Sequence, residues 1–373
     1  MTISCHYPDL DKLVPSYVRE FEPYITSKPD HELKKMYGCP RLYRLNNNEN
    51  PLGPPPDAQQ VIRRFPPPAG AVYPSGDSYY LRHANAEIHG IQPDQVLVGN
   101  GANEVIAFVI KAFCEQEDNI ITADRTFAVY EWVATFSGIG AKLIPLKEEG
   151  FDDGEMLRNI DAQTKIIFLC NPNNPTGTYW SRDRLTAFLD AVDGRQIVVI
   201  DEAYFEFVEA EDFPDGVSLL KVYPNVVVFR TFSKMYGIAG LRIGYLMADL
   251  GVVDIIRRTC VVYSVNSIAQ EAALAALRDD TGHMGRTRDL VRQSRAFLCE
   301  ELGKMGLSII TGEGNFLIVR LPGSDTLAYR LLMREGVMIR PMTGFRYPNH
   351  IRVTLAQMEA MEAFIGALKK MLS

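Results

Sequence analysis

The fold of this chain is decided by a strand that ends in polar residues, I-V-V-I-D-E-A-Y at positions 197–204. Its first four residues are apolar throughout, which is typical of a strand covered by helices on both faces of a parallel sheet. Similar β-branched runs alternate with longer mixed segments between about positions 94 and 246, and they predict strands at 96–98, 119–122, 165–169 and 226–229. The alternation predicts an α/β fold with a mostly parallel central sheet and helical crossovers.

The segments that follow four of these strands are polar, glycine-rich or charged. They are G-N-G-A-N-E at 99–104, C-N-P-N-N-P-T-G at 170–177, D-E-A-Y at 201–204 and R-T-F-S-K at 230–234. In such sheets ligands bind at the carboxyl ends of the strands. We therefore expect the functional site where these four segments meet.

The length favours two domains, because 373 residues exceed the size at which one hydrophobic core usually stops growing. In the last third, helical patterns at 267–277 and 286–305 precede strand-like runs at 315–320, 337–340 and 351–354 and a terminal helix. This order predicts a smaller C-terminal α/β layer. The predicted organisation is an N-terminal arm at 1–50, a large domain at 51–255 and a small domain at 256–373.

Charge and composition exclude several kinds of partner. The chain has 46 acidic and 39 basic residues, a net charge of -7 and no basic block, which argues against nucleic acid and anionic membranes. No apolar run approaches the roughly 18 to 20 residues that span a bilayer, and the start lacks a leader-like pattern. Scattered cysteines, with neither C-x-x-C nor H-E-x-x-H, predict reduced thiols, no metal and a cytoplasmic location.

Lys234 stands directly after a predicted strand, and three features near strand ends give it a chemical setting. Arg242 follows in a glycine-rich stretch, where its guanidinium could bind a phosphate bidentately or pair with a carboxylate between domains. Asp201 could hold a protonated ring nitrogen or cap a helix. The backbone N–H groups of the turn at 99–104 precede a helical pattern and favour an anion. Together these groups suit pyridoxal 5′-phosphate held as a Schiff base on Lys234.

Two other classes of protein are built on similar strand-turn-helix units. An NAD-dependent dehydrogenase would need glycine or alanine where the turn has Glu104. A non-catalytic effector-binding domain of a regulator is the second alternative, and the first 53 residues contain no DNA-binding pattern that would favour it.

Four motifs occur in order along the chain: N-E-N-P-L-G at 48–53, N-N-P-T-G at 173–177, D-E-A-Y at 201–204 and S-K-M-Y-G-I-A-G-L-R at 233–242. With them the chain resembles the fold type I, pyridoxal-phosphate-dependent class I/II aminotransferases over nearly its whole length. Within that family it is most similar to the histidinol-phosphate aminotransferases and the related threonine-phosphate decarboxylases. The resemblance implies a large domain with a mostly parallel sheet, a smaller C-terminal α/β domain and pyridoxal phosphate as the cofactor.

The resemblance also assigns roles to individual residues. The catalytic ones would be Lys234, which binds the cofactor covalently, Asp201, which holds its ring nitrogen, and Tyr204, which contacts the ring hydroxyl together with Asn174. The residues implied at the phosphate are Gly101, Ala102, Asn103, Ser233 and Arg242. Phe127 occupies the place of the aromatic side chain that stacks on the ring. Tyr73 would reach the phosphate in a neighbouring subunit, which implies a homodimer with shared active sites.

Substrate recognition is implied for residues near both ends of the chain, namely Tyr24, Asn50, Arg340 and Arg352. The loop between the two arginines departs from the family and reads M-T-G-F-R-Y-P at 342–348, which adds Arg346 as a third candidate cation. Asn46, Asn47 and Ala356 are further departures beside the expected pocket.

The predicted function is amino-group transfer between a small-molecule amino donor and a keto acceptor, with a small amino acid or amino phosphate as substrate. A role in amino-acid biosynthesis follows from the resemblance. Because the same cofactor-binding residues also support other reactions, a lyase or cyclase that decarboxylates, eliminates or closes a ring is the alternative.

Overall fold

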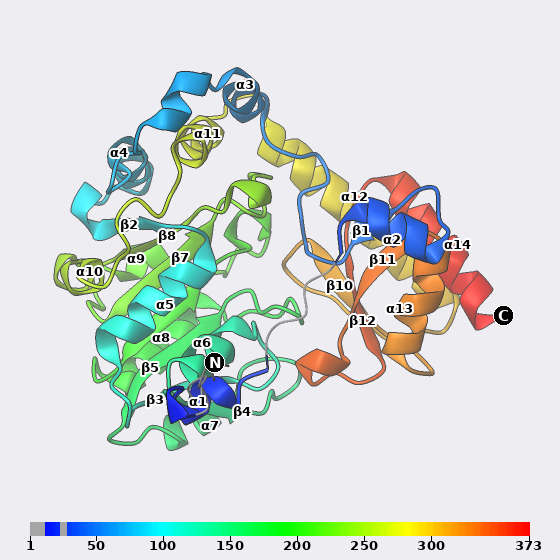
Figure 1. Cartoon of the computed structure of the whole chain (residues 1–373). Helices are drawn as coiled ribbons and strands as arrows, with labels where there is room; N and C mark the ends of the chain where they lie inside the picture. The colour runs from blue at the N-terminus through cyan, green and yellow to red at the C-terminus, as the bar shows by residue number, and fades with distance from the viewer. Residues whose placement is uncertain (1–11, 23–27) are drawn as a thin grey trace, which may run out of the picture.

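The computed structural model, which describes residues 12–22 and 28–373, forms two lobes (Figure 1). The larger lobe contains a seven-stranded sheet in the order β2-β8-β7-β6-β5-β3-β4. Its strands are β2 (Val96–Gly99), β3 (Asn119–Ala123), β4 (Gly140–Ile144), β5 (Thr164–Cys170), β6 (Ile197–Asp201), β7 (Val226–Thr231) and β8 (Gly244–Ala248). Only β8 runs antiparallel to its neighbours β2 and β7, so the predicted mostly parallel sheet is confirmed.

The five strands predicted in this part of the chain are all present, and the sheet contains two more. β4 begins with Gly140, Ala141 and Lys142, which have low strand propensity, and it lies at the edge of the sheet. β8 begins at Gly244, two residues after Arg242 in the glycine-rich stretch that follows Lys234, and glycine has low strand propensity. A Cβ at Gly244 would lie 3.1 Å from the backbone nitrogen of Ala102, so glycine lets β8 pass close to the turn after β2.

Helices connect the strands of the large sheet, and their apolar sides bury its faces. In the helix after β2, for example, the buried residues are Val105, Ile106, Phe108, Val109 and Ile110. The helices of this lobe are α3 (Pro56–Arg64), α4 (Tyr79–His89), α5 (Ala102–Phe113), α6 (Val129–Phe136), α7 (Asp153–Arg158), α8 (Arg182–Val192), α9 (Gly216–Leu219), α10 (Leu250–Arg257) and α11 (Ser267–Leu277). A short helix, α1 (Ser16–Arg19), packs near α6.

The smaller lobe contains a second sheet in the order β1-β11-β12-β10-β9. Its strands are β1 (Tyr43–Leu45), β9 (Ile309–Ile310), β10 (Phe316–Arg320), β11 (Val337–Pro341) and β12 (His350–Thr354). Its helices are α2 (Asp30–Tyr37), α12 (His283–Lys304), α13 (Asp325–Arg334) and α14 (Met358–Leu372). The predicted smaller α/β domain is therefore present, and α12 runs from the α3–α11 region toward it (Figure 1).

Contacts of two segments bear on the domain limits, which stay a prediction. β1 pairs in parallel with β11, and Leu33 of α2 packs against Met333 and Met338, so this part of the predicted arm joins the small sheet. α11 packs against α3 and α4 of the large lobe. Because burial of Leu45 and Leu33 requires the small sheet, we propose that the small domain comprises residues 30–45 and 283–373.

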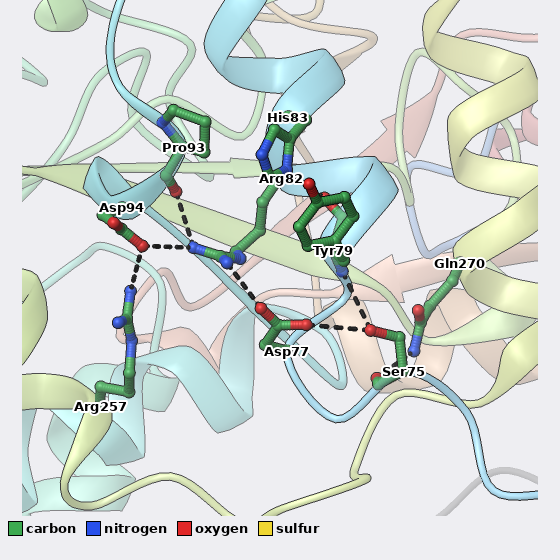
Figure 2. A network of polar contacts seen from close by, with 9 residues as sticks. All are labelled: Ser75, Asp77, Tyr79, Arg82, His83, Pro93, Asp94, Arg257 and Gln270. Carbon is green, nitrogen blue, oxygen red and sulfur yellow. Dashed lines mark hydrogen bonds and ion pairs between the residues drawn. The ribbon is translucent and has the colours of Figure 1, made fainter.

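A polar network fixes the segment that leads into α4 (Figure 2). The buried Arg82 donates to Asp77 Oδ2 at 2.6 Å and to the carbonyl oxygen of Pro93 at 2.9 Å. Gln270 of α11 donates to the carbonyl oxygen of Ser75 at 3.0 Å. These bonds hold the turn after Tyr73 against α4 and α11.

Within residues 12–22 and 28–373, no helix is both long and apolar enough to cross a membrane. The same residues contain no group of three or more histidine, cysteine, aspartate or glutamate side chains placed to hold a metal ion.

Candidate active site

A cavity of about 380 Å³ lies at the carboxyl ends of the central strands, where Cys170 ends β5, Asp201 ends β6 and Thr231 ends β7. The sequence predicts the site at this edge. The predicted cofactor residues that line the cavity are Ala102, Asn103, Phe127, Asn174, Asp201, Tyr204, Ser233, Lys234 and Arg242. The structure therefore brings together residues from six separate segments of the chain.

Lys234 lies in the wall of this cavity, and its Nζ donates to the carbonyl oxygen of Asn47 at 2.9 Å. Loss of solvent around the amine lowers the pKa of Lys234 to about 7, and the positive charge of Arg352 adds to the effect. A substantial fraction of the amine is therefore neutral near neutral pH. A neutral amine is the form that attacks an aldehyde and that accepts a proton.

Asp201 ends β6 as a buried carboxylate with two hydrogen-bond donors. Its Oδ2 accepts from the Tyr130 hydroxyl at 2.5 Å, and its Oδ1 accepts from the Ala203 backbone N–H at 3.1 Å. Burial raises the pKa of Asp201 to about 6, while the Tyr130 and Ala203 bonds oppose the rise. A carboxylate that stays ionised at neutral pH in a closed environment suits a protonated ring nitrogen.

Tyr204 and Asn174 line the same cavity, and neighbouring side chains hold their polar groups. The Tyr204 hydroxyl accepts from Asn48 Nδ2 at 2.9 Å. Asn174 Oδ1 accepts from Arg352 Nη1 at 2.6 Å. Burial raises the pKa of Tyr204, so its hydroxyl keeps its proton and can donate to a ring oxygen.

The turn between β2 and α5 forms an anion cradle with Arg242. Gly101 has φ +82°, and a Cβ there would lie 2.4 Å from Arg242 Nη2, so only glycine lets the guanidinium approach the start of α5. Ala102 and Asn103 open this twelve-residue helix, whose first N–H groups favour an anion. Arg242 donates to the carbonyl oxygen of Ala239 at 2.9 Å and has no carboxylate partner among the described residues.

These groups fit pyridoxal phosphate, whose three attachment points need an amine, an acid and a phosphate cradle. Lys234, Asp201 and the turn at Gly101 supply them around one cavity. Gly101 leaves room for the Arg242 guanidinium where a Cβ would clash with it. If Arg242 served only in a structural ion pair, this close approach to the start of α5 would have no explanation.

Two of the predicted substrate residues, Arg340 and Arg352, line an adjoining cavity of about 580 Å³ that also reaches Lys234. They are paired across β11 and β12. Arg340 Nη2 donates to Asn47 Oδ1 at 2.6 Å, and Arg352 Nη2 donates to the carbonyl oxygen of Asn46 at 2.8 Å. The two guanidinium groups therefore converge on one region, and Asn46 and Asn47 help to orient them.

Arg346 lies outside these two cavities, contrary to the expectation of a third substrate cation. Its Nη1 and Nη2 donate to both carboxylate oxygens of Glu131 on α6, at 2.9 and 2.8 Å. Arg346 has a left-handed backbone conformation, with φ 60°, and its bonds to Glu131 join its side chain to the large lobe.

Asn50 also does not face either cavity. Its Nδ2 donates to the Met235 carbonyl oxygen at 2.7 Å and to Thr287 Oγ1 at 3.2 Å. Because Met235 follows Lys234, these bonds make Asn50 a support of the lysine loop, and its role toward substrate stays a prediction.

The remaining predicted residues are Tyr24 and Tyr73. Tyr24 lies outside the described residues. Tyr73 is 80% exposed, and its ring stacks on Tyr263 with the ring centres 4.9 Å apart. It borders a separate surface hollow and does not line the cavity of its own chain.

The sequence did not single out Tyr130 and Asn48, which contact Asp201 and Tyr204. Asn48 is the first residue of the N-E-N-P-L-G motif, and its membership of that motif was a usable signal. Tyr130 lies three positions after Phe127, the spacing that places two side chains on one face of a helical turn.

Fold and cavity together define a fold type I enzyme of the pyridoxal-phosphate-dependent class. The chain matches the family "Aminotransferase class I and II" over residues 40–368, and it belongs to that family. It is 39% identical to the histidinol-phosphate aminotransferase of Anaeromyxobacter sp. (strain Fw109-5) over 362 residues, which cover 96% of this chain and 99% of the relative.

Solved structures agree on the fold. Histidinol-phosphate aminotransferase from Sinorhizobium meliloti in complex with pyridoxal-5'-phosphate has a TM-score of 0.85 at 23% identity, covering 96% of each chain. L-threonine-O-3-phosphate decarboxylase from Porphyromonas gingivalis has a TM-score of 0.78 at 23% identity, covering 89% of this chain and 99% of that one.

The predictions of family, fold class and aminotransferase activity are confirmed by these findings. The class I/II aminotransferases use pyridoxal phosphate, so the predicted cofactor is confirmed as well. Because the relatives support an aminotransferase activity, the dehydrogenase and the non-catalytic effector-binding domain no longer stand as alternatives.

Proposed function

We propose that this aminotransferase acts on a small substrate that carries both an amino group and an anionic group, of the histidinol-phosphate or amino-acid type. The observation that carries the proposal is the position of Arg340 and Arg352 in a cavity that also reaches Lys234. Arginine binds phosphate and carboxylate groups through two parallel hydrogen bonds. The name of the 39% identical relative supports a phosphorylated substrate and a role in amino-acid biosynthesis.

The residues of this chain divide the chemistry between them. When bound, pyridoxal phosphate supplies an electron sink that stabilises negative charge at the carbon bearing the amino group. Lys234, with a pKa of about 7, accepts the proton from that carbon. Asp201 would hold the ring nitrogen, and the Tyr204 hydroxyl would donate to the ring oxygen. Arg340 and Arg352 hold the anionic group and so fix the orientation of the carbon.

We further propose a cytoplasmic homodimer in which Tyr73 completes the partner's active site. Tyr73 is exposed and does not line the cavity of its own chain, and both facts support this arrangement. The five free cysteines of the described residues suit a reducing compartment.

The test is product analysis of the purified enzyme with histidinol phosphate or a small amino acid and a 2-oxo acid acceptor. Amino transfer predicts one new amino acid from the acceptor for each keto or aldehyde product. Release of carbon dioxide, ammonia or a ring product without an acceptor would contradict the proposal and favour the lyase or cyclase.

A further inference from the structure

Tyr130 lies directly behind the active-site cavity on α6, and its side chain is completely buried. Its ring stacks on Phe168 of β5, with the ring centres 4.7 Å apart and the planes at 13°. Phe127, which lines the cavity, meets the same ring edge-on at 5.5 Å. These two contacts fix the direction in which the Tyr130 hydroxyl points.

That direction is toward Asp201. The Tyr130 hydroxyl donates to Asp201 Oδ2 at 2.5 Å, and the Ala203 N–H is the other donor to this carboxylate. The titratable groups that face Asp201 are Tyr130 from α6, Cys170 from β5, Tyr204 from the loop after β6 and Lys234 from the loop after β7. Burial raises the pKa of the two tyrosines and of the cysteine, so all three are neutral at neutral pH.

A buried carboxylate can lose its function by becoming too strong a base. Burial alone disfavours the ionised form, and a basic carboxylate competes with the ring nitrogen of the cofactor for one proton. A hydrogen bond donated to the ionised form counteracts this effect. Among the contacts of Asp201, the bond from Tyr130 lowers its pKa the most.

We propose that Tyr130 is a positioning residue that acts through Asp201, orienting the carboxylate and keeping it a weaker base than the ring nitrogen beside it. This inference rests on the cofactor assignment of the proposed function and not on the identity of the substrate. The proton therefore stays on the ring, where it makes the cofactor an electron sink.

The test compares holoenzyme of the Tyr130→Phe variant with the unchanged enzyme in a pH titration of the cofactor's visible absorbance. Without the hydroxyl the ring carries less positive charge, so the imine nitrogen at Lys234 holds its proton more tightly. The absorbance midpoint should rise by about one pH unit or more, the size expected for a hydrogen bond to a charged group. The kcat should fall at least about tenfold with less than about a threefold change in KM.

Tyr223→Phe is the matched control, because it removes a tyrosine-to-aspartate hydrogen bond, 2.7 Å long to Asp190, far from the cavity residues. Its midpoint should equal that of the unchanged enzyme. Tyr130→His is a second variant, in which the imidazole ring again offers a hydrogen-bond donor. Its absorbance midpoint should lie between those of the unchanged enzyme and of Tyr130→Phe.

The coupling to Asp201 is tested by repeating Tyr130→Phe in an Asp201→Asn background. There the second substitution should produce no further shift, since the group through which it acts is absent. An equal shift in both backgrounds, or an unchanged midpoint in folded Tyr130→Phe, would overturn the inference. The titration needs no substrate, so its outcome is independent of whether the enzyme transfers amino groups from the proposed substrates.

Discussion

At the scale of single residues, burial of Lys234 determines when its amine can react. With a pKa of about 7, the amine loses its proton as the pH rises through neutrality. We expect the rate at which cofactor-free enzyme captures pyridoxal phosphate to increase with pH and to level off above about pH 8. Rapid-mixing absorbance measurements would report this rate. A rate that keeps rising to pH 10, as for an exposed lysine, would contradict the role of burial.

The sequence marks both Arg352 and Arg346 as candidate substrate cations, and these two residues provide a matched pair of variants. Arg352→Lys should raise KM for an anionic substrate about 10- to 100-fold, because its buried, planar fork cannot be reproduced by an ammonium group. Arg346→Lys should change KM less than about twofold, since Arg346 is paired with Glu131 outside the cavities and this exposed ion pair contributes little to stability. Steady-state kinetics of both variants checks this, and equal effects would mean that Arg346 reaches the substrate.

The positions of site residues could be predicted from the sequence where position along a strand determines them. Asp201 ends β6 and Asn174 follows β5, so their side chains reach the same edge of the parallel sheet by topology alone. The position of the Arg346 side chain depends on the left-handed backbone conformation of Arg346 in its turn. The position of the Tyr130 side chain depends on its packing against Phe168. Such contacts are set by tertiary structure and leave little signal in a local pattern.

At the scale of elements, the turn between β2 and α5 has no room for a Cβ atom at Gly101, so one substitution there should disrupt the proposed phosphate site. Gly101→Ala places a Cβ against Arg242 in a backbone conformation with φ +82°. We expect the dissociation constant for pyridoxal phosphate to rise at least about tenfold, as for a lost charge-assisted hydrogen bond.

Gly90→Ala is the control, because Gly90 has φ +63° at the end of α4 but has no atom within 4 Å of an added Cβ. In thermal unfolding, Gly90→Ala should lose about 1–2 kcal/mol of stability, and Gly101→Ala, with φ 82° and ψ 169°, about 1–3 kcal/mol. Only Gly101→Ala should lose cofactor affinity, measured by equilibrium titration of the apo forms. Equal affinities would remove the turn from the phosphate site.

Strong strands could be predicted from their own residues, whereas weak ones depend on neighbours. All five buried β-branched runs of the large sheet are strands in the structure. β8 begins with glycine and is held between β2 and β7, and β1 is three residues long and is held by β11. For such short or glycine-containing strands, tertiary pairing outweighs intrinsic propensity.

At the scale of the whole molecule, the proposed dimer makes a prediction about mixed subunits. Chains carrying Lys234→Ala and chains carrying Tyr73→Ala should each have little activity alone. Refolding or co-expressing the two together should restore activity, because one site of each mixed dimer then combines an intact Lys234 with the partner's intact tyrosine. Activity assays of the purified mixed species, with each variant alone as control, check this. No recovery in a confirmed mixed dimer would contradict shared sites.

The proposed function depends above all on Lys234 as the residue that holds the cofactor. The most direct measurement is borohydride reduction of the holoenzyme, proteolysis and mass spectrometry of the resulting peptides. We predict a pyridoxyl group attached to Nζ of Lys234 and its complete loss in Lys234→Ala. A pyridoxyl group on another lysine, or an unmodified Lys234 peptide from enzyme that retains bound cofactor, would contradict the account.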